Sequence, residues 1–225
     1  MDSLNMSGIK SVLNKTPTLR RLLIPGPSVA LCSMGGVGST ALARHIGSIA
    51  DKTIREHAYS PSVYHNENQI KLGYVFGNPY NSVLSVFRRG YQDMHCKAMN
   101  ANSGDKPVSL KGVELIDYLN SGVDQFGLDR QLSNWLNPGL AKHPTILIKY
   151  EELADNIDEV LAFFDCEKPF DVKTRTSSWK SQPAPIVNGL ESLYGDFYQK
   201  VQDMPAITIL NGKEEVLQSV KSNHE

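Results

Sequence analysis

The sequence contains few cysteines and no arrangement of them that would build a cross-linked or metal-stabilised fold. Cys32, Cys96 and Cys166 are the only three, and they stand far apart. An odd, sparse set makes a poor disulfide framework and lacks the short repeated spacing of zinc sites. No metal site is therefore predicted, and reduced cysteines in the cytoplasm are the simplest interpretation.

Long apolar runs are missing as well. No uninterrupted apolar stretch approaches the ~20 residues that cross a bilayer. Residues 1–21 have no apolar core behind a basic start, so they do not resemble a secretory signal. A soluble, cytoplasmic protein without a membrane partner is expected.

The chain also lacks an excess of positive charge. It has 23 Lys and Arg residues against 24 Asp and Glu residues, a formal net charge of −1. A broad nucleic-acid-binding surface normally requires a basic excess, so no nucleic-acid partner is expected, while a local basic pocket for a nucleotide stays compatible. With 40% hydrophobic and 21% charged residues, the 225-residue chain has the composition of one globular domain.

Strands and helices are predicted to alternate along the chain. Short apolar runs bounded by breakers predict buried strands at 28–34, 71–76 and 145–150. Helical patterns occupy 39–50, 79–90, 110–120, 125–137, 151–164 and 190–201. This alternation predicts an α/β fold, a three-layer domain with a mostly parallel sheet flanked by helices.

The ends of the chain and one internal segment are predicted to lie outside this core. Residues 1–26 form an N-terminal helical extension, and residues from about 212 to 225 form a polar tail that we expect to be loosely held. Residues 97–109 are predicted to form a polar loop. The whole chain, 1–225, is expected to be a single domain.

A glycine-rich segment, Ser33-Met-Gly-Gly-Val-Gly-Ser-Thr40, lies between the first predicted strand and its helix. Glycines let the backbone turn tightly and bring amide hydrogens close to an anion, and the helix N-terminus adds further amides and its positive dipole end. We therefore predict a phosphate site whose binding residues are Gly35, Gly36, Val37, Gly38, Ser39 and Thr40. The alternative is a tight turn that binds nothing.

The same segment lacks the lysine of a nucleotide-hydrolysing P-loop. That motif has the form GxxxxGK[ST], in which the lysine reaches the terminal phosphates. Here Ser39 follows Gly38. ATP hydrolysis is disfavoured, although a P-loop nucleotide-binding protein or kinase stays an alternative.

Three segments together resemble the sulfotransferase family, whose donor is 3′-phosphoadenosine 5′-phosphosulfate (PAPS). Gly36-Val-Gly-Ser-Thr40 resembles the family's loop for the donor 5′-phosphate, commonly K/R-S-G-T-T. Gly77-Asn-Pro-Tyr-Asn-Ser-Val-Leu-Ser85 is similar to R-D/N-P-x-D-x-x-x-S, which holds the 3′-phosphate. Ile146-Leu-Ile-Lys-Tyr-Glu-Glu-Leu153 and the following helix resemble the family's Y-E-D/E-L segment. The resemblance spans about residues 28–165 and implies the family's P-loop NTPase-like fold.

Two departures from the family pattern concern the donor site. Gly36 and Gly77 stand where the family has cations that face donor phosphates, and charge-assisted contacts are the strong ones. Arg88 or Arg89, with Ser85, is expected to reach the 3′-phosphate, and Arg175 is a further candidate for a missing cation. Solvated, structural roles are the alternative for each.

The resemblance implies transfer of a sulfuryl group from PAPS to a hydroxyl or amine of a small-molecule or glycan acceptor. The reaction needs a base beside the acceptor, and Glu56 and His57 are the catalytic candidates by their distance from the glycine loop. Neighbouring residues point in different directions, so one of the two is expected to face the site. A degenerate family member that binds without turnover is the non-enzymatic alternative, and the sequence does not predict the oligomeric state.

Overall fold

A computed structural model of the chain describes residues 28–48, 52–67, 70–101, 103–104, 106, 108–173, 178–211 and 216–217. For residues 28, 52–56 and 216–217 it describes the backbone alone. The predicted N-terminal extension, 1–26, lies outside these residues, as do Arg175 and most of the predicted polar tail.

The centre of the protein is a six-stranded sheet in the order β2-β1-β3-β4-β5-β6. Its first four strands in that order run parallel, and β5 and β6 are antiparallel to their neighbours. The strands are β1 (Ser28–Ser33), β2 (Lys52–Glu56), β3 (Ile70–Phe76), β4 (Pro144–Lys149), β5 (Ile207–Asn211) and β6 (Val216–Leu217). The predicted α/β class with a mostly parallel sheet is confirmed.

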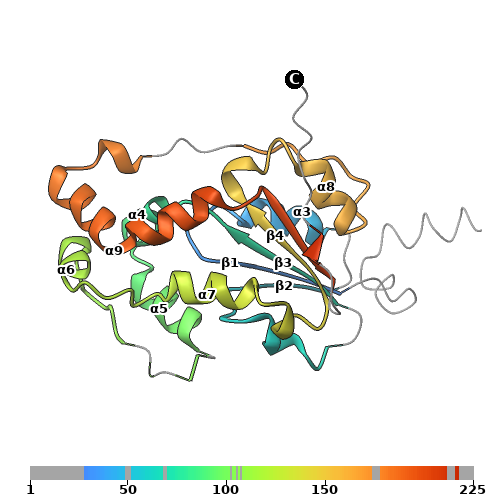
Figure 1. Cartoon of the computed structure of the whole chain (residues 1–225), viewed down its shortest axis with the longest axis horizontal. Helices are drawn as coiled ribbons and strands as arrows, with labels where there is room; N and C mark the ends of the chain where they lie inside the picture. Colours follow the sequence, from blue (N-terminus) through green and yellow to red (C-terminus); the bar gives the residue numbers. More distant parts are fainter. Residues whose placement is uncertain are drawn as a thin grey trace, which may run out of the picture.

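Helices cover both faces of this sheet (Figure 1). Adjacent residues of a strand point to opposite faces. On β3, the ring of Tyr74 stacks on Trp135 of α7 (Leu128–Trp135), whereas a Cβ on Gly73 would meet Phe164, which follows α8 (Ile157–Phe163). Helix α8 therefore lies on the face opposite α7. A ring contact between His45 and Phe170 joins α3 (Thr40–Gly47) to the segment after α8.

The remaining helices form a group beyond the end of the sheet where α4 begins. The long α9 (Ala184–Asp203) packs against α4 (Pro79–Arg88) and α6 (Leu115–Asn120), and α5 (Gln92–Asn100) adjoins α4. Short 3-10 helices are η1 (Pro61–Tyr64), η2 (Pro138–Leu140), η3 (Tyr150–Glu152) and η4 (Trp179–Ser181).

A buried hydrogen-bond network ties this helical group together. The hydroxyl of Tyr194 on α9 donates to Oδ1 of Asp124 at 2.8 Å and lies 2.5 Å from the hydroxyl of Tyr118 on α6. Asp124 also accepts from the backbone N–H groups of Gly127 and Leu128 at the start of α7. Burial raises the pKa of this carboxyl above its ordinary value, and the Tyr194 hydrogen bond opposes that shift.

Several predicted elements differ from those observed. The polar loop predicted from residue 97 is wrong in its first part, because α5 continues to Asn100. The helix predicted over 110–120 begins only at Leu115, and the one predicted over 151–164 is η3 followed by α8. The backbone of Val216–Leu217 pairs with β5, so this part of the predicted polar tail extends the sheet.

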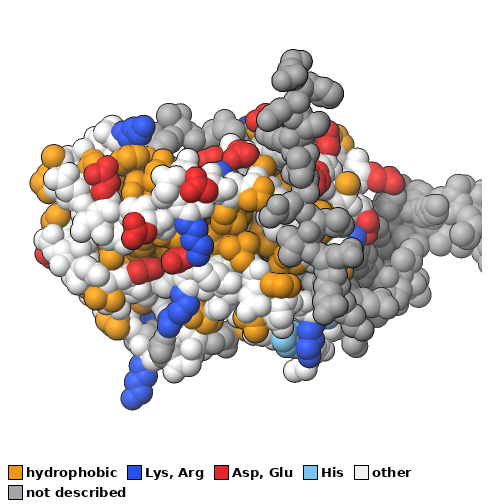
Figure 2. Space-filling view, in the orientation of Figure 1, with side chains coloured by type: hydrophobic (Ala, Val, Ile, Leu, Met, Phe, Trp, Pro, Cys, Tyr) orange, Lys and Arg blue, Asp and Glu red, His pale blue; other side chains and the backbone are white. Residues whose placement is uncertain are grey.

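The three cysteines are buried. In the described part of the chain, no helix combines the length and apolar character needed to cross a bilayer. On the face drawn in Figure 2, basic and acidic side chains are interspersed and do not gather into one basic surface.

Candidate functional site

The glycine loop lies where the connections of the sheet change direction. From β1 the chain moves to β2 on one side, and β3 then pairs with β1 on the other side. In open α/β sheets, ligands bind outside the carboxyl ends of the strands at such a switch point. The glycine loop follows β1 and the start of α4 follows β3, so both predicted donor segments meet at this position.

Three glycines give the loop its shape. Gly35, Gly36 and Gly38 have φ angles of 80°, 70° and 82°, in the left-handed region that glycine adopts without strain. The loop also packs closely against α4. A Cβ on Gly36 would lie 2.4 Å from the carbonyl oxygen of Ser82 and 2.8 Å from its Cα. The Ser82 hydroxyl donates to the carbonyl of Gly35 at 2.6 Å. No side chain fits at position 36 while α4 stays in this position.

The N-terminus of α3 carries no internal cap. Ser39 is the N-cap residue, but its side chain makes no capping hydrogen bond, and the first turn contains no acidic residue. Among the described residues, none accepts a hydrogen bond from the backbone N–H groups of Gly36, Val37 or Gly38. Unpaired amides at a helix N-terminus are an anion-binding arrangement.

The side chains of the loop are used in different ways. The Ser39 hydroxyl donates to the Ser33 hydroxyl at 3.0 Å and is buried, so it points into the protein. Thr40 is half-buried at the first position of α3. The Val37 side chain belongs to the core, so this residue offers a ligand its backbone amide.

Two histidines flank the base of the loop. The Nδ1 atom of His57 lies 2.8 Å from the carbonyl oxygen of Ser33. A carbonyl only accepts, so Nδ1 carries the proton and Nε2 is the basic nitrogen of the neutral ring. His95 of α5 lies with its ring centroid 4.4 Å from that of His57, and its Nδ1 would be 2.7 Å from a Cβ on Gly35.

Of the two predicted bases, Glu56 and His57, the structure describes the side chain of His57 alone. His57 contacts the residue that precedes the glycine loop. Glu56 is the last residue of β2, and its side chain lies outside the described residues. The expectation that one of the two neighbours faces the site stays a prediction.

A pocket of about 670 Å³ runs along α4. Ser85 and Arg88 line it together with Asn81, Ser178 and Gln182. The two predicted arginines have different surroundings. Arg88 lines the pocket, whereas Arg89 donates a hydrogen bond from Nε to the carbonyl of Ser85 at 2.9 Å and lies over the ring of Tyr91. Of these two arginines, Arg88 is therefore the one that lines a pocket together with Ser85.

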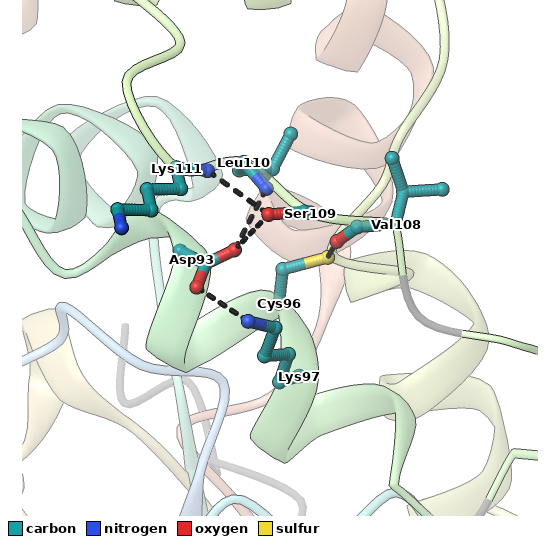
Figure 3. A network of polar contacts seen from close by, with 7 residues as sticks. All are labelled: Asp93, Cys96, Lys97, Val108, Ser109, Leu110 and Lys111. Carbon is teal, nitrogen blue, oxygen red and sulfur yellow. Dashed lines mark hydrogen bonds and ion pairs between the residues drawn. The ribbon is translucent and has the colours of Figure 1, made fainter.

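A polar network joins α5 to the segment around Ser109 and Leu110 (Figure 3). Oδ1 of Asp93 accepts from the Ser109 hydroxyl at 2.8 Å and from the N–H of Leu110 at 2.9 Å, and Oδ2 accepts from Lys97 at 2.7 Å. The Lys97 hydrogen bond, followed by that of Ser109, lowers the pKa of Asp93 from its ordinary value. The segment that Asp93 binds, Ser109 and Leu110, is followed closely by Val113, which lines the pocket. The carbonyl of Val113 accepts a hydrogen bond from the side-chain amide of Gln92.

Sequence reasoning missed three contributors to this region. Helix α5 was not predicted, so neither the place of His95 beside Gly35 nor that of Asp93 was foreseen. Tyr150 belongs to the segment that resembles the Y-E-D/E-L motif and is not among the predicted site residues, yet its hydroxyl would lie 2.9 Å from a Cβ on Gly38. The polar, weakly amphipathic sequence of α5 gave no clear helical signal, and its burial depends on packing against α4 and the loop.

The described residues contain no group of three or more His, Cys, Asp or Glu side chains suited to a metal ion. The fold is that of a doubly wound α/β protein whose glycine loop lies at the switch point of the sheet. Comparisons with models of protein families, with curated proteins and with solved structures found no match.

Proposed function

We propose that this protein is a sulfotransferase-like enzyme that binds PAPS at the switch point and transfers its sulfuryl group to a hydroxyl or amine. The observation that carries the proposal is the contrast between two helix ends. At α3 the N-terminus has no side-chain cap and follows three left-handed glycines. At α4, by contrast, the Asn78 side chain accepts from the N–H groups of Tyr80 and Asn81. Of these two helices, α3 is the one whose first amides have no side-chain cap and could bind a ligand phosphate.

We assign the donor's second phosphate to Ser85 and Arg88 on α4. Ser85 and Arg88 lie one helical turn apart on the same side and line one pocket. A hydroxyl and a guanidinium together suit a phosphate, since charge-assisted hydrogen bonds are short and strong. The missing P-loop lysine, with Ser39 in its place, favours PAPS over ATP as the donor.

The chemistry assigned to the site is direct transfer. His57 Nε2 accepts the proton of the acceptor hydroxyl or amine, a bond forms from that oxygen or nitrogen to sulfur, and the bond from sulfur to the phosphate oxygen breaks. The leaving group is 3′-phosphoadenosine 5′-phosphate (PAP), whose 5′-phosphate the amides at α3 stabilise. Positioning and charge stabilisation supply most of the rate enhancement in transfers of this type.

Calorimetric titration with PAP, using AMP and ATP as comparison ligands, tests the donor assignment. The matched variants are Arg88→Ala and Arg89→Ala, which remove the same charge from neighbouring positions. We expect Arg88→Ala to weaken PAP binding at least about tenfold, the loss of one charged hydrogen bond, and Arg89→Ala to change it little. Equal effects of the two variants, or preference for ATP in the unmodified protein, would count against the proposal.

A binding protein of the same fold without turnover is the second candidate. It is favoured by the two glycines, Gly36 and Gly77, that stand where the family carries cations. Transfer from PAPS to a panel of phenols, sugars and amines distinguishes the candidates. Transfer that is lost in a folded His57→Ala variant supports the enzyme, whereas PAP binding with no transfer to any acceptor supports the binding protein.

A further inference from the structure

The N-terminus of α4 holds an anion that belongs to the protein itself. Oε1 of Glu151 accepts a hydrogen bond from the backbone N–H of Asn78 at 2.8 Å. The Asn78 side chain accepts from the next two amides, those of Tyr80 at 2.9 Å and Asn81 at 3.3 Å. The positive end of this helix dipole, which would attract a ligand anion, is therefore already compensated.

The same carboxylate occupies the space beside Gly77. A Cβ on Gly77 would lie 2.7 Å and 3.0 Å from the two carboxylate oxygens of Glu151. A side chain at position 77 and a carboxylate in this position compete for one volume. Glycine at 77 and the position of the exposed Glu151, whose carboxylate is directed toward the start of α4, are thus parts of one arrangement.

Glu151 also borders the glycine loop. It belongs to η3, whose first residue, Tyr150, contacts Gly38 of the loop. The N–H of Gly77 donates to the sulfur of Met34, which immediately precedes the glycines. Both η3 and the start of α4 therefore adjoin the glycine loop.

We infer that Glu151 is a specificity-determining residue that keeps a second anionic group away from the N-terminus of α4. The inference deepens the proposed function and rests on it. A bisphosphorylated nucleotide such as PAP must carry its second phosphate further along α4, to Ser85 and Arg88, and binds against the repulsion of Glu151. A nucleotide with a 5′-phosphate alone meets less of that repulsion.

The variant Glu151→Gln removes the charge and keeps an oxygen that accepts from Asn78. Calorimetry at low salt is expected to show PAP binding tightened by about fivefold or more and AMP binding by less than about twofold, a range suited to a partly solvated charge. The gain for PAP should shrink at high salt, because exposed charges are screened. Glu159→Gln, which removes the same charge from the exposed side of α8, should change neither affinity.

Unchanged PAP affinity in Glu151→Gln, or equal gains in affinity for PAP and AMP, overturns the inference. The PAPS proposal then still stands if the unmodified protein binds PAP. If neither nucleotide binds either protein, the proposed function fails, and inorganic sulfate decides the inference. Sulfate must then raise the melting temperature of Glu151→Gln more than that of the unmodified protein. Equal shifts overturn the exclusion of anions by Glu151.

Discussion

Gly36→Ala is the substitution whose cost the structure defines best. The added Cβ would meet two backbone atoms of Ser82, the carbonyl oxygen at 2.4 Å and Cα at 2.8 Å, at a residue with φ of 70°. The left-handed conformation costs an L-residue about 1–2 kcal/mol. Overpacking against atoms that cannot move aside costs about 1–3 kcal/mol more. The sum is about 2–5 kcal/mol, or a fall in melting temperature of about 4–20 °C for a protein of this size.

Gly90→Ala is the matched control for this measurement. Gly90 has almost the same φ, 67°, but no atom lies within 4 Å of the Cβ that would be added. It should lose only the conformational part, about 1–2 kcal/mol. Thermal unfolding followed by circular dichroism gives both values. If Gly36→Ala costs no more than Gly90→Ala, the loop does not press on α4 at Ser82, and the structural reason for glycine at position 36 is refuted.

Two further predictions concern stability elsewhere in the protein. Because the pKa of Asp93 is lowered in the folded protein, its ionised form stabilises the folded state above the ordinary Asp range, and this contribution is lost as the pH falls through the folded-state pKa. Asp93→Asn should therefore be less stable than the unmodified protein at neutral pH and approach its stability below about pH 4. A stability difference that does not narrow on acidification would contradict this. Tyr194→Phe removes a buried hydrogen-bond donor to Asp124 and should lower the free energy of unfolding in denaturant by about 1–3 kcal/mol. Tyr91→Phe, at an exposed ring, should lower it little. Equal losses would show that the Tyr194 hydroxyl does not support the network.

The sequence predicted the central strands and the glycine loop because both depend on local patterns. Strands β1, β3 and β4 are short apolar runs between breakers, and burial on both faces is what such runs indicate. The Asn78-Pro79 start of α4 was equally readable, because an Asn N-cap with proline in the first turn is a local signal.

The elements that escaped prediction depend on the rest of the fold. Strand β2 contains polar residues and pairs only with β1, at the edge of the sheet, so its sequence shows no buried run. Strand β5 pairs antiparallel with β4, and its pairing depends on the return of the chain through α9. The contact of His95 with Gly35 joins residues sixty positions apart along the chain, and no local pattern reports such a contact.

The structure gives a reason for glycine at positions 36 and 77 that the sequence alone does not offer. The resemblance to the sulfotransferase family implies that Gly36 and Gly77 replace cations of a phosphate site. In the structure, each glycine lets another group approach: the Ser82 backbone at position 36 and the Glu151 carboxylate at position 77. A cation restored at either position would first have to displace that group, so a simple Gly77→Arg change should not improve anion binding unless Glu151 is neutralised as well. Under the proposed function, the positive charge for a ligand then comes from another residue, and Arg88, which lines the pocket along α4, is the candidate.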